Sequence, residues 1–289
     1  MLRQLVVLAG LIIASPVQAS DPKSDEETSL LWKIEHEDLK QPSYLFGTIH
    51  LICEEDYFWS AEMGAALASS REVCFEMDLD DPGLISEMAL GMIDPSGNTL
   101  EDYFSTEDYN KIEQFVRDSL GINLSVFNRM KPAALQALFA SRGLSCLTPV
   151  SYENNILEAA RKLDLQITGL ESPSEQIALF DQIPVDSIIR EIVNLVENNS
   201  NARLEYRRLL DAYQSQNLAA LSSILEESGL THSDKEIFLY RRNKKWIDRM
   251  VEKMEQQPVF FAVGAGHLWG NEGLIQLLRQ EGFKLTPVR

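Results

Sequence analysis

The chain has 289 residues and a formal net charge of −18, from 26 lysines and arginines against 44 aspartates and glutamates. Hydrophobic residues make up 45% and charged residues 24%, a globular balance that excludes disorder of the whole chain and fibrous repeats. Nucleic acids and anionic membrane surfaces bind concentrated positive charge, so the acidic composition argues against both as partners.

The first 19 residues are typical of a secretory signal peptide. Arg3 precedes an apolar run that is too short to span a bilayer comfortably, and small residues before and at Ala19 suit a signal peptidase. We therefore expect cleavage after Ala19, a flexible lead-in over residues 20–28, and export to the periplasm or beyond. The alternative is an uncleaved anchor helix, which Pro16 disfavours; no other stretch is apolar enough for a stable membrane span.

Strand-like and helical patterns then follow in a clear order. Residues 30–36 and 43–50 are β-rich runs separated by a polar turn, which predicts an antiparallel hairpin. A short helix is expected over residues 59–70 and a strand over 71–79. From about residue 83 to 147 the pattern is helical.

The second half repeats this alternation. A helix over residues 151–164, with Ser151 as its N-cap, leads into a short strand over 165–171. A long helical block over about 173–256 comes next, and the chain ends with a strand, a helix and a strand over 258–288. Strands at both ends of the chain, with helical blocks between them, predict an α/β fold.

Two segments near the ends of the chain look alike. Residues 43–51 and 258–270 each read as an apolar strand, a G-x-x-H motif and a turn into a helix. This likeness predicts a central mixed sheet built from two related half-domains, with a large helical insertion (about 83–147 and 173–256) between them. We expect these parts to form one domain over residues 29–289.

The four histidines fall into two groups. His36 and His232 lie in polar surroundings and are expected at the surface. His50 and His267 each follow a glycine by three residues at the carboxyl end of a strand, where α/β proteins gather their chemistry. Glycine permits the tight, sometimes positive-φ turn that lets an imidazole point inward. The alternative is that His50 and His267 are buried core or helix-capping residues with a purely structural role.

Two acidic residues are candidate partners for these histidines. Glu76 and Glu171 lie in otherwise apolar strands, where an unpaired charge is costly and a ligand or partner is expected. Ser172 begins a capped helix directly after Glu171 and would fix the direction of that carboxylate. With His50 and His267, the two glutamates form a set that can hold a divalent transition metal and activate water.

The only dense basic run is R-R-N-K-K-W over residues 241–246. On a helix most of these side chains face solvent, but Arg242 and Asn243 can reach a pocket and hold an anionic or carbonyl group. The cysteines are Cys53, Cys74 and Cys146, so at most one intramolecular disulfide forms. Cys74 lies in a strand-like run and is expected to be buried. Cys53 and Cys146 lie in loop-like contexts, which favours a disulfide between these two but does not decide the pairing.

The motifs together resemble the TraB/GumN family. They are, in chain order, G-T-I-H over 47–50, Glu76, G-L-E-S-P-S-E-Q over 169–176, Arg242-Asn243, and G-A-G-H over 264–267. The resemblance extends from about residue 30 to 289, and the family belongs to a wider group with the Tiki proteases, the haem-binding ChaN proteins and the erythromycin esterases. It implies an α/β fold whose two related halves enclose the active site.

The resemblance also implies chemistry. Tiki members are described as metal-dependent proteases with paired G-x-x-H motifs, erythromycin esterases use a histidine as general base, and TraB-like members are linked to limiting peptide pheromone activity. Carried onto matching positions, the site comprises His50, Glu76, Glu171 and His267, with Arg242 and Asn243 nearby. A Cys53–Cys146 bridge is implied as well, because exported relatives carry cysteines at these places.

We therefore expect a metal-dependent hydrolase, a peptidase acting on a peptide or small-molecule substrate. Its histidines and one glutamate would hold Mn²⁺, Co²⁺ or Zn²⁺, the second glutamate would be the general base, and Arg242 or Asn243 would stabilise the oxyanion. A metal-free, esterase-like hydrolase with His50 or His267 as the base is one alternative. A non-catalytic protein that binds a peptide or a haem-like ligand is another, and the sequence is silent on oligomeric state.

Overall fold

A six-stranded sheet with the order β4-β3-β5-β2-β1-β6 forms the centre of the molecule. The computed structural model describes residues 28–139, 143, 144, 146, 148–198, 201–228 and 230–289. The predicted signal peptide, and the predicted lead-in except Thr28, lie outside the described residues. The strands are β1 (Leu31–Glu35), β2 (Ser43–Thr48), β3 (Glu72–Met77), β4 (Gln166–Glu171), β5 (Val259–Gly264) and β6 (Lys284–Val288).

The sheet is mixed, as the sequence predicts. β1 and β2 form the expected antiparallel hairpin, with Leu31 opposite Phe46, and β6 pairs antiparallel with the other edge of β1. β2, β5, β3 and β4 run parallel to one another. The β2–β5 pairing sets Tyr44 opposite Phe260 and so joins segments from the two ends of the chain. The carboxyl ends of all four parallel strands therefore lie along one edge.

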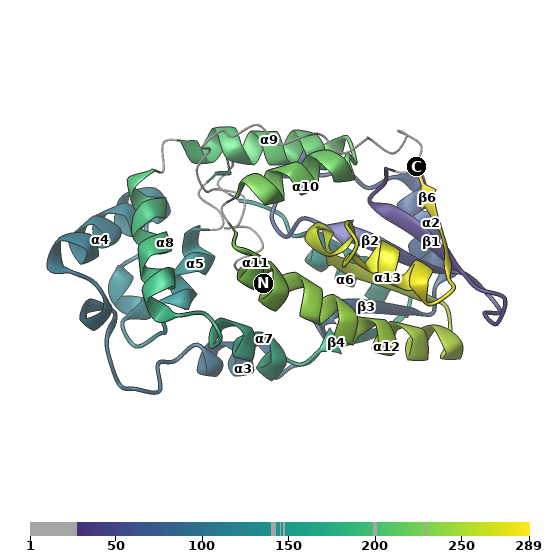
Figure 1. Ribbon diagram of the computed structural model, residues 1–289, viewed down its shortest axis with the longest axis horizontal. Coiled ribbons are helices and arrows are strands. Elements are labelled where there is room, and N and C mark those ends of the chain that lie inside the picture. Colours follow the sequence, from purple (N-terminus) through teal and green to yellow (C-terminus); the bar gives the residue numbers. More distant parts are fainter. Residues whose placement is uncertain (1–27, 140–142, 145, 147, 199–200, 229) are drawn as a thin grey trace.

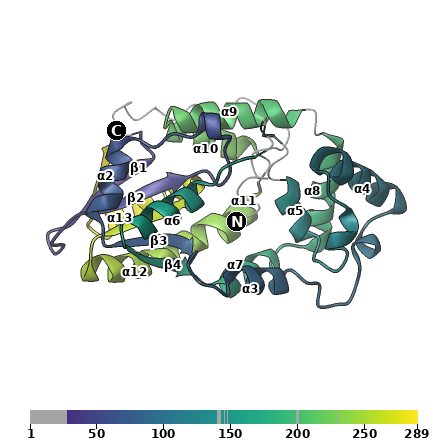
Figure 2. The same ribbon diagram turned by 180° about the vertical axis from the view of Figure 1, so that it is seen from behind.

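Helices cover both faces of the sheet. α12 (Arg241–Gln256) and α13 (Leu274–Gln280) lie on one face, in front of the strands in Figure 1. α2 (Ala61–Ser69) and α6 (Tyr152–Lys162) lie on the opposite face, which Figure 2 shows from behind. β3 and β5 are wholly buried and β2 is nearly so, and these strands supply Phe46, Phe75, Phe260 and Phe261 to the core.

A group of helices extends the molecule at one end of the sheet (Figures 1 and 2). They are α3 (Leu84–Gly91), α4 (Thr106–Leu120), α5 (Ala133–Phe139), α7 (Pro173–Phe180) and α8 (Val185–Glu197). In this helical lobe α3 packs on α7, and α4 and α5 pack on α8. The lobe has a hydrophobic core of its own, separate from that of the sheet. Both predicted helical blocks contribute to it.

Three further helical pieces connect the lobe to α12. α9 (Ala202–Gln214) and α10 (Leu218–Glu227) run along the upper side in Figure 1. α11 (His232–Lys235) then continues into a π-helical turn, Glu236–Tyr240, which passes directly into α12. The sequence predicts an uninterrupted α-helix here. Single π turns inside helices are frequent at functional sites, because the extra residue rotates everything that follows.

Serine side chains cap the first turns of several helices. The Ser151 side chain caps α6, and Ser172 and Glu175 form the capping box that starts α7. For α4 the cap is Ser105, whose hydroxyl accepts a hydrogen bond from the N–H of Asp108. Such caps satisfy the first N–H groups of a helix and depend only on neighbouring residues.

A disulfide joins Cys53 to Cys146, with a Cα–Cα distance of 5.7 Å, which confirms the favoured pair. Beside it Ile52 and Val150 form an antiparallel bridge, with N–H to carbonyl distances of 3.0 and 2.8 Å. Cys74 is buried and carries a thiol, as expected. Among the described residues, no helix has the length and apolar character needed to cross a membrane.

Candidate functional site

The sequence-predicted residues come together at the carboxyl edge of the parallel strands. His50 follows β2 by two residues, Glu76 lies in β3, Glu171 ends β4, and His267 closes a 3₁₀ turn directly after β5. Because β2, β5, β3 and β4 are consecutive neighbours in the sheet, segments far apart in the chain supply one site. The other two histidines are at the surface, with side chains 25% and 82% exposed.

The glycine of the first G-x-x-H motif is required by close packing. A Cβ on Gly47 would lie 2.8 Å from Cδ2 of Leu268 and 3.0 Å from Cα of Ala265, closer than real contacts allow. Neither motif glycine has a positive φ, and Gly264 has a φ of −54°. The positive-φ turn considered from the sequence is therefore not the reason for these glycines. At Gly47 the missing side chain lets β2 lie against the turn that carries the second histidine.

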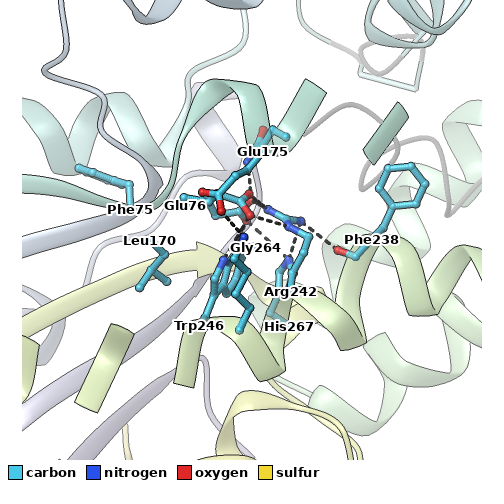
Figure 3. A network of polar contacts seen from close by, with 12 residues as sticks. Phe75, Glu76, Leu170, Glu175, Phe238, Arg242, Trp246, Gly264 and His267 are labelled. Carbon is cyan, nitrogen blue, oxygen red and sulfur yellow. Dashed lines mark hydrogen bonds and ion pairs between the residues drawn. The ribbon is translucent and has the colours of Figure 1, made fainter. Parts of the chain in front are cut away.

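Arg242 holds the acidic part of the site together. Its Nη2 lies 2.6 Å from Oε2 of Glu76 and 2.5 Å from Oε1 of Glu171. Its Nη1 donates to the carbonyl oxygen of Phe238 and lies 3.2 Å from Nε2 of His267. Figure 3 shows the guanidinium among these groups, and the arginine is only 4% exposed. One buried cation is thus shared by two buried carboxylates and offsets one of their two negative charges.

Further contacts fix the Glu76 carboxylate. Its Oε1 accepts the N–H of Gly264 at 2.9 Å, and its Oε2 accepts from the Gln176 amide at 3.3 Å. Burial alone would raise the pKa of Glu76, but the positive charge of Arg242, with a smaller contribution from His50, lowers that pKa well below its usual range. Glu76 is therefore an anion at neutral pH.

His267 is fully buried and neutral. Its Nδ1 lies 2.5 Å from Oδ1 of Asn243, whose amide nitrogen donates to the carbonyl oxygen of Glu272 at 2.7 Å. The amide oxygen can only accept, so the ring proton is on Nδ1 and Nε2 accepts from Arg242. The Trp246 ring packs on the imidazole at 4.4 Å. Burial and then the charge of Arg242 lower the pKa of His267 well below its usual value.

His50 has a carboxylate partner that sequence analysis missed. Its Nδ1 lies 2.7 Å from Oε1 of Glu153, which also accepts from the Thr48 hydroxyl at 2.7 Å. The other oxygen of Glu153 accepts from Ser151 at 3.0 Å. Burial lowers the pKa of His50, but the charge and hydrogen bond of Glu153 and the charge of Glu76 more than offset it, so that pKa is raised.

Nothing in the local sequence singles out Glu153. An acid in the first turn of a helix is ordinary, because it faces the positive end of the helix dipole. The one signal in the sequence is the pair of cysteines. Cys53 closely follows His50 and Cys146 precedes Glu153 by a short segment, so a bond between the cysteines draws the two segments together. The Ile52–Val150 bridge described above lies between the two pairs.

Two cavities border His50. The smaller, about 10 Å³, is lined by His50, Glu76 and Glu153 together with apolar residues of β3 and β5. That volume approaches the ~10–15 Å³ in which a single water is held by polar partners. The larger, about 70 Å³, is mainly apolar, and Thr48, His50 and the turn after β5 lie on the side that faces the site. The site can therefore set a water and an organic group beside one imidazole.

Residues 30–287 match the TraB/PrgY/gumN family. This chain belongs to that family. The metalloprotease TIKI2 of Danio rerio is 24% identical over 93% of this chain and 63% of its own length, and the metalloprotease TIKI1 of Homo sapiens is 23% identical over 91% and 63%. This chain thus spans less than two thirds of these relatives. The uncharacterised protein YbaP of Shigella flexneri is 28% identical over 82% of this chain and 88% of its own length.

No solved structure gives a significant match to this TraB/PrgY/gumN member. The relatives' names make a metal an obvious question, and the arrangement of the side chains bears on it. Across the described part of the chain, no three His, Cys, Asp or Glu side chains are grouped as metal ligands. Three of the four predicted ligands, Glu76, Glu171 and His267, instead surround the Arg242 guanidinium. As arranged, the predicted ligands do not fit a four-coordinate divalent ion, and their assignment as ligands stays a prediction.

Proposed function

We propose that this TraB/PrgY/gumN member is a hydrolase with peptidase-like activity, and that His50 is its general base. One observation carries the proposal: His50, paired with Glu153 at 2.7 Å, borders both a water-sized cavity and an apolar cavity. An imidazole whose Nδ1 is held by a carboxylate is a common arrangement for activating a nucleophile. The relatives named metalloproteases support a peptide as the substrate.

The pair would act on water. The hydrogen bond from Nδ1 to Glu153 fixes the ring and its tautomer, so that proton transfer falls to Nε2. When water attacks a carbonyl carbon, Nε2 takes its proton, and the negative charges of Glu153 and Glu76 stabilise the resulting imidazolium. The same proton then passes to the leaving amine as the carbon–nitrogen bond breaks, and the neutral imidazole is restored.

Arg242 and Asn243 would support this chemistry indirectly. The sequence analysis assigned them to the oxyanion. Arg242 instead contacts Glu76 and Glu171, and Asn243 contacts His267, so we propose that both position the site. Glu76 in turn would act through its charge on His50. His267, fully buried, would hold the turn after β5 rather than touch the substrate.

A metal-dependent mechanism is the alternative that the experiment below distinguishes from a histidine base. The relatives' names support a metal of unspecified identity, whereas the Arg242 contacts argue that Glu76, Glu171 and His267 already share a cation. The two branches differ in one measurable way. A histidine base works in the presence of a chelator, and a metal-bound water does not.

The test is cleavage of a mixed-sequence peptide library by the purified chain, read by mass spectrometry with and without EDTA, beside elemental analysis of the protein. We expect cleavage that survives EDTA and disappears in His50→Ala. EDTA-sensitive cleavage restored by Mn²⁺, Co²⁺ or Zn²⁺ would replace the histidine-base mechanism by the metal branch. Cleavage of esters alone would reassign the substrate. A Soret band on adding haem, without hydrolysis of any substrate, would contradict the proposal.

We also propose that the chain works in an oxidising compartment, the periplasm or the exterior. The Cys53–Cys146 disulfide supports this, because such bonds persist where thiols are not kept reduced. The predicted signal peptide, cut after Ala19, would supply the route. N-terminal sequencing of protein from the periplasmic fraction tests it: Ser20 as the first residue agrees, and a cytoplasmic protein that begins at Met1 disagrees.

A further inference from the structure

The larger cavity beside His50 is built from apolar side chains of several helices. Its volume is about 70 Å³. The residues that give it its character are Leu209, Leu221, Leu225, Phe238, Leu239 and Trp269. Thr48, His50 and the Gly264–Gly266 turn, which belong to the proposed active site, line it as well. The cavity is thus continuous with the place where the proposed hydrolysis occurs.

We propose that this cavity binds an apolar side chain of the substrate, branched aliphatic or aromatic, next to the bond that is cleaved. The inference rests on the proposed function and names its substrate class. The cavity has several times the ~10–15 Å³ that one water needs, yet its lining offers few polar partners, so water gains little there. A charged side chain would lose its hydration without compensation, whereas an apolar one gains by leaving water.

Part of the cavity lining belongs to a small apolar cluster of its own. Leu225 and Leu239 form a small cluster, separate from the cores of the sheet and of the helical lobe. Leu230, Tyr240 and Trp269 pack against that cluster and are only partly buried. An additional apolar group can therefore be accommodated between the two cores without displacing a tightly packed side chain.

One helical turn links the cavity to the charged part of the site. Phe238 and Leu239, both in the π-helical turn, line the cavity. The carbonyl oxygen of Phe238 accepts from Arg242, whose guanidinium holds Glu76 and Glu171. The same turn therefore sets the shape of the apolar cavity and the position of the arginine. An apolar side chain seated there would hold the adjoining peptide bond beside His50.

The test uses three small amides that resemble single residues of a peptide: N-acetyl-L-phenylalaninamide, N-acetyl-L-leucinamide and the α-amide of N-acetyl-L-aspartic acid, which keeps its side-chain carboxylate. Each is titrated into the purified, disulfide-bonded chain while tryptophan emission is followed, because Trp269 lines the cavity. We expect the two apolar amides to change the emission saturably and the acidic amide to have no effect. The Trp269→Phe variant should lose most of the signal.

A variant whose own side chain fills the cavity is compared with a matched control variant. A Cβ on Gly266 meets only Leu239, at an ordinary 3.7 Å, so Gly266→Leu directs a side chain toward the lining. Gly64, in α2, gives the control: its Cβ would meet only Trp59, at 3.6 Å, and it does not line the cavity. We expect Gly266→Leu to weaken binding of the apolar amides at least tenfold and Gly64→Leu to leave it unchanged.

The outcomes separate the inference from the proposed function, because binding is measured without turnover. Equal binding of acidic and apolar amides, or unchanged binding by folded Gly266→Leu, overturns the inference. Peptide cleavage without preference for an apolar residue beside the cut overturns it too, while leaving the hydrolase intact. Selective binding of the apolar amides, blocked in Gly266→Leu, supports the inference even if no peptide is cleaved, and only the proposed function then fails.

Discussion

Glu153 contributes most to raising the pKa of His50, and the charge of Glu76 adds to it. Burial of the imidazole acts to lower the His50 pKa, and Glu153, hydrogen-bonded to Nδ1 at 2.7 Å, reverses the direction. Burial raises the pKa of Glu153, but the charge of His50 and the hydrogen bonds from His50 and Thr48 together lower it below its usual value. Each partner thus favours the charged form of the other, which ties the activity of the proposed base to this pair.

The Glu153→Gln variant is expected to change the pH dependence of hydrolysis. In the native chain the raised pKa of His50 places the rising limb of kcat/KM above pH ~6.5, the ordinary histidine value. Removing the negative charge lowers that pKa, so the limb moves to lower pH by about one unit or more. The measurement is a pH–rate profile, with the His50 ring signals followed by NMR. A limb that stays in place would show that another group is the base.

Arg242 is expected to be needed for folding as much as for activity. In Arg242→Met two buried carboxylates lose their shared cation, which should lower the free energy of unfolding by about 3–5 kcal/mol. Arg241→Met is the neighbouring control: that side chain is 58% exposed, and a change within about 0.5 kcal/mol is expected. Urea unfolding measures both. Equal stability of the two variants would contradict the ion-cluster account.

For individual residues, the sequence predicted which of the motif side chains meet at the site, but not how they pair. Glu76 and Glu171 were identified because a carboxylate in an apolar strand needs a partner, and that partner is Arg242. The pairing of His50 with Glu153 joins positions that are 103 residues apart. No local pattern encodes such a contact. It follows from how β2 and α6 are placed around the sheet.

Among the elements, β2 packs closely against the turn after β5 at Gly47. Gly47→Ala would put a Cβ 2.8 Å from Leu268, so we expect a loss of about 1–3 kcal/mol in the free energy of unfolding, together with reduced activity. Gly64→Ala in α2 meets ordinary contacts at 3.6 Å and should stabilise by up to ~1 kcal/mol. Thermal unfolding of both tests this; a Gly47→Ala protein as stable as the native chain would refute it.

Elements with local causes were predictable from the sequence, and long-range ones were not. The β1–β2 hairpin and the Ser172–Glu175 capping box depend on residues close in the chain, and both form as expected. The parallel pairing of β2 with β5 depends on the whole fold. The π turn at Glu236–Tyr240 also escaped prediction, because its apolar residues recur at nearly the spacing of an α-helix.

For the molecule as a whole, the disulfide closes the long segment between the start of the sheet and α6. Its cysteines are 93 positions apart, and in the chain-entropy view opening so large a loop costs stability through the unfolded state. We expect the Cys53→Ser/Cys146→Ser variant to lose about 2–5 kcal/mol in urea unfolding. An unchanged midpoint would contradict this.

Alkylation of the denatured chain gives the control for the redox state. The oxidised protein should take up one label, on Cys74, and the reduced protein three. In the native protein Cys74 should resist alkylation, because burial raises its pKa to about 12. Three labels on unreduced, denatured protein would show that the bond is absent.

The most direct test of the account is peptide hydrolysis by the His50→Ala variant beside His232→Ala, whose side chain is 82% exposed in the native chain. With a peptide found by the library assay, kcat/KM should fall at least about 10²-fold in His50→Ala and stay at the native value in His232→Ala, with both proteins folded by circular dichroism. Native activity in a folded His50→Ala protein would contradict the central claim that this histidine is the base.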